Sequence, residues 1–196
     1  MYKNVLIIGP GRAGKTTLSK MLNKKYGYSI ISIDDIVSGF ESYPELQIHH
    51  DGNENNTAKR LVPFLLNYLK ELSEGNKFYD NCKFVIEGTH IDFEGLIPKI
   101  NLDKYLLIGL TYNNITKEEL YNIIRKYDTE DDWTYWCEDE ELKGNTEYFI
   151  KRNRFFNDKF KEYNIKTFDT SKERDKVLKK ALKYIEDNAY GKKDTN

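Results

Sequence analysis

The chain has little cysteine, no long apolar run and almost no net charge. Its 196 residues include two cysteines, Cys82 and Cys137, too few for a disulfide framework or a cysteine-rich zinc site. We therefore expect a reducing, cytoplasmic location. No apolar run approaches the ~18 to 20 residues of a membrane-spanning helix. The sequence also enters a strand-like run directly, so we expect no signal peptide and no membrane partner.

The formal net charge of −1 argues against a dedicated nucleic-acid-binding protein. This average hides a local excess, because residues 128–141 contain eight acidic side chains and no Lys or Arg. We call residues 128–141 the acidic segment. The rest of the chain is correspondingly basic, which suits a protein that binds phosphate. The length fits a single domain with a sizeable core, and nothing in the sequence indicates the oligomeric state.

Apolar runs alternate along the chain with segments of helical periodicity. Such alternation predicts an α/β sandwich built around a parallel sheet. Strands are expected at 3–8, 29–33, 83–87, 105–110 and 165–168. Helices are expected at 15–25, 57–74, 116–127, 145–162 and 172–187, with a polar loop over 38–56. Thr170 and Glu173 have the spacing of a capping box for the last helix.

A glycine-rich turn follows the first expected strand. Residues 9–16 read GPGRAGKT and match G-x-x-x-x-G-K-[ST], the phosphate-binding loop. In such a loop consecutive backbone N–H groups hold a polyphosphate, Lys15 reaches the β- and γ-phosphates, and Thr16 offers a hydroxyl to Mg²⁺. The expected cofactors are therefore ATP and Mg²⁺. The nucleotide-binding residues are expected to be Gly9, Pro10, Gly11, Arg12, Ala13, Gly14, Lys15, Thr16 and Thr17.

The same glycines permit another interpretation. Gly9, Gly11 and Gly14 also fit G-x-G-x-x-G, the dinucleotide-binding pattern. Asp34 lies 20 residues after Gly14, where such a site places its ribose-binding acid. A Lys-Thr pair directly after the last glycine is required by a phosphate loop and not by a dinucleotide site. The pair favours the phosphate loop, and NADH binding remains the alternative.

Three motifs together resemble the small P-loop kinases of bacteria. They are GPGRAGKT after the first strand, SIDD in the second and FVIEG in the third. The superfamily includes shikimate, gluconate and nucleoside monophosphate (adenylate-kinase-like) kinases and zeta-toxin-like kinases. The resemblance follows the element order over most of the chain and is specific at the phosphate loop. It implies a P-loop NTPase fold, a three-layer α/β sandwich whose five-stranded parallel sheet has the order 2-3-1-4-5, with a helical lid.

The same resemblance implies how the chain is divided. One kinase domain is expected over 1–190, with a lid at about 125–152 and an acceptor-binding insertion at about 36–60. Residues 191–196 are expected to form a disordered tail.

Acidic residues mark the ends of two strands. Parallel sheets bind ligands at the carboxyl ends of their strands, so Asp34 and Glu87 are expected to face the phosphate loop. A carboxylate beside a hydroxyl can orient or deprotonate it, and the resemblance gives this role to Asp34. Asp35 is the alternative base or a helix cap. The resemblance makes Glu87 the second acid, and the predicted metal set is Thr16, Asp34 and Glu87. His90 is a further candidate, with a purely structural role as its competitor.

The chain has only six arginines, and three lie next to the acidic segment. Arginine is suited to phosphate oxygens, and the resemblance implies such arginines where the lid begins and ends. We therefore predict that Arg125 and Arg152 are catalytic, with Arg154 as the alternative and surface ion pairing as the competing interpretation. For Trp133 and Trp136 we favour packing inward beneath a solvated acidic surface over a site for a cationic acceptor.

These features predict an ATP-dependent kinase. It would transfer the γ-phosphoryl group of MgATP to a hydroxyl or phosphate of a small molecule, such as a nucleoside, a nucleotide or a sugar-like acceptor. Lys15, Asp34, Glu87, Arg125 and Arg152 are the predicted catalytic residues. The alternative is a non-catalytic or GTPase-like nucleotide-binding protein. No N-K-x-D motif for guanine recognition is present, and this absence disfavours the GTPase.

Overall fold

A computed structural model describes residues 3–50, 52–74 and 82–190. Its sheet has five strands in the order β2-β3-β1-β4-β5, and every neighbouring pair is parallel. The predicted fold class and strand order are therefore confirmed. The predicted tail, residues 191–196, lies outside the described residues. The strands are β1 (Asn4–Ile8), β2 (Ser29–Ser32), β3 (Phe84–Gly88), β4 (Tyr105–Thr111) and β5 (Lys166–Asp169).

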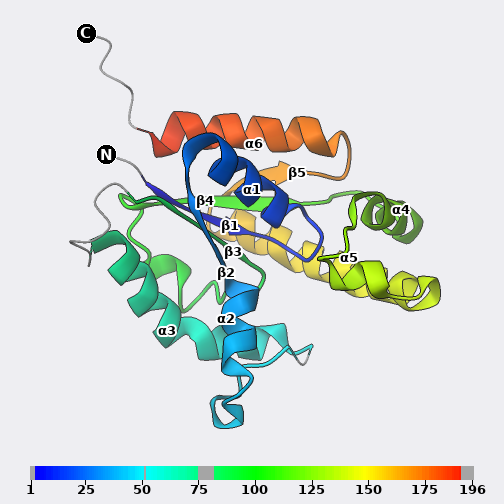
Figure 1. Ribbon diagram of the computed structural model, residues 1–196, viewed down its shortest axis with the longest axis horizontal. Helices are drawn as coiled ribbons and strands as arrows, with labels where there is room; N and C mark the ends of the chain where they lie inside the picture. Colours follow the sequence, from blue (N-terminus) through cyan, green and yellow to red (C-terminus); the bar gives the residue numbers. More distant parts are fainter. Residues whose placement is uncertain (1–2, 51, 75–81, 191–196) are drawn as a thin grey trace.

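Helices cover both faces of the sheet and complete three layers (Figure 1). Helices α1 and α6 pack on one face, and α2, α3 and the carboxyl half of α5 pack on the other. The α-helices are α1 (Lys15–Tyr26), α2 (Ile33–Phe40), α3 (Glu54–Glu74), α4 (Lys117–Tyr127), α5 (Asp139–Glu162) and α6 (Arg174–Ala189). The 3₁₀ helices are η1 (Pro44–Leu46), η2 (Ile97–Lys99) and η3 (Trp133–Trp136). No helix within the described residues is long and apolar enough to cross a bilayer.

Residues 5–8 of the central strand β1 are all apolar because both faces of the sheet are covered. Val5 and Ile7 join the core beneath α1 and α6. Leu6 and Ile8 join the core beneath α3 and α5. Because alternate side chains enter opposite cores, every position of β1 is buried. Each such side chain contributes about 1.5–3 kcal/mol by leaving water, and together they hold the start of the phosphate loop in place.

Helix α2 was not expected, and the segment 38–56 expected as a polar loop contains the end of α2, the 3₁₀ helix η1 and the start of α3. Three other differences have a clear physical reason. Strand β2 ends at Ser32 and not at Ile33, because the Ser32 hydroxyl accepts a hydrogen bond from the Asp35 N–H and starts α2. Helix α3 begins at Glu54, before the expected residue 57, and α5 begins at Asp139, before the expected residue 145. Acidic side chains in the first turn favour both early starts, since they interact well with the helix dipole.

The predicted capping box of the last helix is wrong. Helix α6 follows Glu173, which has a left-handed backbone (φ 48°) and makes no side-chain cap. The Thr170 hydroxyl instead lies within hydrogen-bonding distance of two carbonyls, Ala13 O at 3.1 Å and Thr111 O at 2.9 Å. Thr170 therefore connects the end of β4 to the phosphate loop, and this tertiary contact overrides the local capping pattern.

Candidate active site around the phosphate loop

The loop from Gly9 to Gly14 joins β1 to α1 and has the backbone that its motif requires. A Cβ at Gly9 would lie 2.4 Å from the carbonyl oxygen of Leu110, so only glycine fits beside β4. Gly14 is left-handed with φ 96°. The ammonium of Lys15 is buried and donates to the carbonyl of Pro10 at 3.0 Å. The cation is thus held inside the loop that is predicted to receive phosphate.

Glu87 lies beside this loop at the end of β3. The parallel pairing of β1 with β3 places Glu87 next to Ile7, and the Thr16 hydroxyl donates to its Oε1 at 2.9 Å. Burial raises the pKa of Glu87, opposed by the charge of Lys15 and the Thr16 hydrogen bond. A hydroxyl and a carboxylate are the hard oxygen donors that Mg²⁺ prefers. The predicted metal residues Thr16 and Glu87 are therefore in contact.

Asp34 lies in the first turn of α2, and its carboxylate is partly exposed. Its Oδ1 lies 3.1 Å from Nδ1 of His90, which follows β3 and is only 3% exposed. Burial opposes ionisation of Asp34, but the His90 hydrogen bond and the charges of Lys15 and the histidines together lower its pKa. Asp34 is therefore a carboxylate at neutral pH, and the buried imidazole of His90 fixes its orientation. Asp35 is exposed.

His50, in the predicted acceptor-binding insertion, contacts both Asp34 and His90. Its Nε2 lies 3.2 Å from the carbonyl oxygen of Asp34 and 3.2 Å from the Ser38 hydroxyl. Its ring meets that of His90 edge to face, with centroids 5.3 Å apart. The sequence marks this stretch only as polar, so its arrangement could not be inferred from local pattern.

Arg152 lies on the same side of the site but is already paired. Its Nε is 2.6 Å from Oε2 of Glu54, at the start of α3. Its Nη1 donates to Asn55 at 2.9 Å, and its guanidinium lies 4.7 Å from the ring centre of Phe155. The Thr89 hydroxyl also donates to Glu54 at 3.3 Å. These contacts join α3, the end of β3 and α5 around one ion pair.

The acidic segment reaches the phosphate loop through Arg12. This guanidinium contacts the carboxylates of Asp128 and Asp132, the latter at 2.5 Å. Asp128 also accepts from the Thr134 hydroxyl at 2.9 Å. Burial raises the pKa of Asp128, and the charge of Arg12 opposes the change. Part of the acidic segment is thus neutralised by the loop itself.

The predicted catalytic Arg125 is engaged by the acidic segment. It donates to the carbonyls of Thr134 at 3.0 Å and Cys137 at 2.6 Å, and so holds the short turn η3. This turn buries Thr134 and leaves Trp133 57% and Trp136 70% exposed. The expectation that the tryptophans pack inward is therefore wrong, because the turn presents Thr134 and not the indoles to the interior. Arg154 is exposed on α5.

A residue that the sequence analysis missed lies at the carboxyl end of the loop. Arg174, the first residue of α6, donates to the Thr17 hydroxyl at 3.3 Å and covers the ring of Tyr127 at 4.2 Å. Burial lowers the pKa of Arg174, as does the charge of Arg12. No local motif points to Arg174, since its partner is 157 residues away in the chain.

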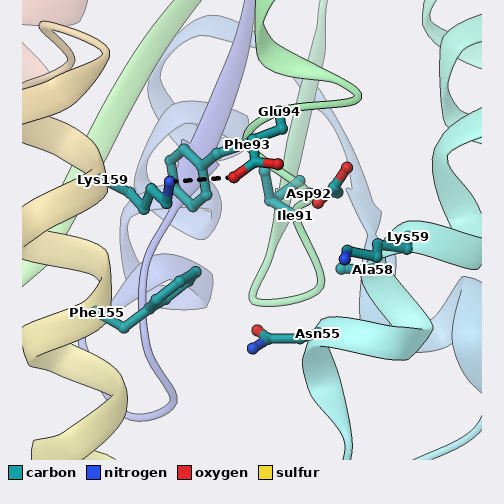
Figure 2. A pocket seen from close by; sticks show the side chains of 9 residues that line it. All are labelled: Asn55, Ala58, Lys59, Ile91, Asp92, Phe93, Glu94, Phe155 and Lys159. Carbon is teal, nitrogen blue, oxygen red and sulfur yellow. Dashed lines mark ion pairs between the residues drawn. The ribbon is translucent and has the colours of Figure 1, made fainter.

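The structure has a hollow of about 160 Å³ on the side of α3 that carries Asn55 (Figure 2). It lies between α3, residues 91–94 and α5. Asn55 both lines it and bonds to Arg152. Its wall combines apolar and aromatic side chains with charged groups of both signs: Asn55, Ala58, Lys59, Ile91, Asp92, Phe93, Glu94, Phe155 and Lys159.

Comparison with solved structures gives the fold an external reference. A shikimate kinase from Bacteroides thetaiotaomicron superposes with a TM-score of 0.55 at 16% identity, covering 95% of this chain and 99% of that chain. A gluconokinase from Sinorhizobium meliloti 1021 has a TM-score of 0.55 at 12% identity, over 95% and 93%. Shikimate kinase from Acinetobacter baumannii, solved with shikimate, has a TM-score of 0.55 at 17% identity, over 97% of each chain.

No family model and no curated protein sequence matches the chain. At these identities the solved structures show the fold, which is the one that the resemblance implied. The chain has the same P-loop fold as these small-molecule kinases over nearly its whole length.

Proposed function

We propose that this protein is a kinase that transfers the γ-phosphoryl group of ATP to a hydroxyl of a small molecule. The observation that carries the proposal is the meeting of Lys15, Glu87 and Asp34 at the ends of three adjacent strands. Lys15 acts on the pKa of both carboxylates, so the three charges are close. A phosphate-binding cation flanked by a metal-suited carboxylate and a second, partly exposed carboxylate suits phosphoryl transfer to a hydroxyl.

The phosphate loop and α1 form the nucleotide side of the proposed site. Residues 9–17 would hold the polyphosphate through backbone N–H groups, with Lys15 exchanging the Pro10 carbonyl for phosphate oxygens. Thr16 would bind Mg²⁺ directly, with Glu87 and Asp34 contacting it through water. The ion would supply neutralisation of the phosphate charge. Arg174 adds a positive charge beside Gly14 and Thr17.

Asp34 is the proposed base on the acceptor side. The acceptor oxygen would form a new bond to the γ-phosphorus while the bond from that phosphorus to the ADP oxygen breaks. The hydroxyl proton would pass to the carboxylate of Asp34, which His90 holds in one orientation. The low pKa of Asp34 keeps this carboxylate ionised and ready to orient the hydroxyl.

The remaining predictions about chain organisation fit this arrangement and stay proposals. Residues 36–60 would bind the acceptor, since His50 and Glu54 lie beside Asp34 and its partners. Residues 125–152 would act as the lid over the nucleotide. The contacts of Arg125 and Arg152 give them structural roles in the present arrangement, so a direct role for either would require the lid to move.

Transfer from γ-labelled ATP to a panel of small hydroxylated acceptors tests the proposal. Lys15→Ala should abolish transfer and leave the circular dichroism spectrum unchanged. Lys20→Ala, an exposed lysine on the same helix, is the matched control and should retain activity. Transfer that survives Lys15→Ala contradicts the proposal. ATP binding without transfer to any acceptor would favour the non-catalytic alternative.

A further inference from the structure

Resting on the proposed function, we infer that the acceptor is a polyhydroxylated molecule without a carboxylate or phosphate group. We infer further that Glu54 sets this preference, because it occupies the guanidinium of Arg152. The inference concerns the acceptor side of the cleft and does not depend on how ATP is held.

A chain of contacts places Arg152 on the acceptor side. The proposed base Asp34 bonds to His90, whose neighbour Thr89 donates to Glu54. Glu54 in turn pairs with Arg152. A chain of contacts therefore leads from the proposed base to the arginine, and we call its residues, with Asn55, the acceptor wall. A small acceptor whose hydroxyl reaches Asp34 would have its far end against this wall.

Arg152 is already engaged within the protein. Its Nε faces Glu54 at 2.6 Å, its Nη1 donates to Asn55, and its plane lies against Phe155. The two charged side chains are only 11% and 17% exposed. An acceptor carboxylate would have to displace Glu54 from this pair, which would leave a half-buried carboxylate without its cation. Such displacement is costly, so the pair rejects anions.

The other cations of this region are committed elsewhere or lie in solvent. Lys15 belongs to the phosphate loop, and Lys159 pairs with Glu94 and Glu162 at 3.5 and 2.9 Å. Lys59 stands exposed at the rim of the hollow, where water screens its charge (Figure 2).

The polar and apolar groups of the acceptor wall and of the hollow suit the binding of hydroxyl groups. Asp34 and Glu54 are acceptors, Asn55 is both donor and acceptor, and Phe93 and Phe155 present apolar surface. Hydroxyl groups can donate to the carboxylates and pair with the amide without bringing a charge that needs compensation. The chemistry of the region therefore matches a neutral polyol.

Matched pairs of acceptors that differ in charge test the inference on the unmodified protein. The pairs are glucitol with gluconate, and methyl shikimate with shikimate. We expect the neutral member of each pair to bind at least about tenfold more tightly, measured by titration calorimetry and, where transfer occurs, by kcat/KM. Tighter binding of the anionic member, lost in Arg152→Gln, would overturn the inference.

Glu54 competes with an acceptor carboxylate for Arg152, so replacing Glu54 tests its role. Glu54→Gln keeps the shape of the side chain and frees Arg152, so affinity for shikimate and gluconate should rise by about tenfold or more. The double variant Glu54→Gln/Arg152→Gln should lose this gain. Glu147→Gln is the control for the loss of one negative charge, since Glu147 lies exposed on α5 in a surface pair with Lys117. No gain in Glu54→Gln, or an equal gain in Glu147→Gln, refutes the role of Glu54.

These results are separable from the proposed function. Binding of the four probes is measured without nucleotide, so it reports on the acceptor wall even if no transfer is found. Absence of Lys15-dependent transfer to any acceptor would refute the kinase while leaving the charge preference to be decided by the binding data. Transfer to shikimate or gluconate in preference to the neutral partner would refute the inference while supporting the kinase.

Discussion

The guanidinium of Arg12, inside the phosphate loop, contacts the carboxylate of Asp128, whose side chain is only 1% exposed. This contact unites two parts of the chain that are 116 residues apart. It also resolves an apparent conflict in the sequence, because an acidic segment close to bound ATP would repel its phosphates. Because Arg12 pairs with both Asp128 and Asp132, its positive charge offsets part of the negative charge that the acidic segment brings to the loop.

Arg12→Ala should therefore destabilise the protein and release the acidic segment. Asp128 would be left buried without its cation, and the loss in unfolding free energy should be about 2 kcal/mol. The emission of Trp133, which packs 6.1 Å from the ring of Phe149, should change as the segment moves. Urea unfolding followed by tryptophan fluorescence measures both effects.

A second substitution shows whether the unpaired carboxylate is the cause. Arg12→Ala/Asp128→Asn should recover part of the lost stability, since an amide tolerates burial without a cation. Arg154→Ala, an exposed arginine on α5, serves as the control and should unfold like the unmodified protein. If the double variant is less stable than Arg12→Ala, charge pairing is not what Arg12 contributes.

Glu87→Gln should raise stability at neutral pH and lose that advantage in acid. Burial raises the pKa of Glu87 above its ordinary value of 4.5, so the folded protein holds this proton more tightly than the unfolded chain. Its contribution to stability is full below pH 4.5 and is lost as the pH rises through the raised pKa. Glutamine keeps the oxygen that accepts from Thr16 but carries no charge to bury.

Melting temperatures across pH 4 to 8 test this prediction. The variant should melt above the unmodified protein at pH 7, and the two curves should converge towards pH 4. Glu140→Gln, on the exposed surface of α5, controls for the lost charge. A difference that grows in acid would reverse the sign and contradict the buried-carboxylate argument. Transfer activity should fall in Glu87→Gln, because the predicted metal contact is weakened.

The sequence predicted the features that depend on neighbouring residues. Consecutive apolar residues identify β1 because both faces of the sheet are covered, and GPGRAGKT identifies the loop because its backbone demands glycine. Helix α2 was not predicted, and the capping box predicted for α6 was wrong. The Ser32 hydroxyl accepts from the Asp35 N–H at the start of α2, and the Thr170 hydroxyl contacts distant carbonyls instead of capping α6.

Sequence reasoning anticipated the arrangement of candidate residues where it depends on the strands and missed it where it depends on distant side chains. Asp34 follows β2 and Glu87 lies near the end of β3, so sheet order brings them to the same edge. Arg174 and His50 come from elements whose approach no local pattern encodes. Arg152 was identified as an arginine near the lid, but its pairing with Glu54 is visible only in three dimensions.

Two glycine-to-alanine substitutions distinguish a required glycine from a dispensable one. Gly9→Ala should destabilise the protein by about 2 kcal/mol or more, because the new Cβ meets the backbone of Leu110 at 2.4 Å. Gly39→Ala should stabilise by about 0.5–1 kcal/mol, since nothing lies within 4 Å and α2 gains helix propensity. Chemical denaturation of both variants measures the contrast. Equal effects would mean that the loop backbone yields at Gly9.

Replacing His90 tests whether it sets the ionisation of Asp34. His90→Ala removes the hydrogen bond that opposes the effect of burial, so the pKa of Asp34 should rise. His90→Asn places an amide donor near the position of Nδ1 and should keep the pKa close to that of the unmodified protein. The side-chain carboxyl signal of Asp34, followed by ¹³C NMR through a pH titration, gives the value directly and needs no acceptor.

The same titration separates a specific hydrogen bond from a general loss of packing. His49→Ala removes the histidine next to His50, whose backbone carbonyl accepts from the Thr57 hydroxyl. It should leave the Asp34 titration unchanged. If His90→Ala and His90→Asn raise the pKa of Asp34 equally, the packing of the His90 ring, and not a hydrogen bond from its Nδ1, controls this pKa. If neither raises it, Lys15 and His50 suffice to keep Asp34 ionised, and His90 has no part in preparing the proposed base.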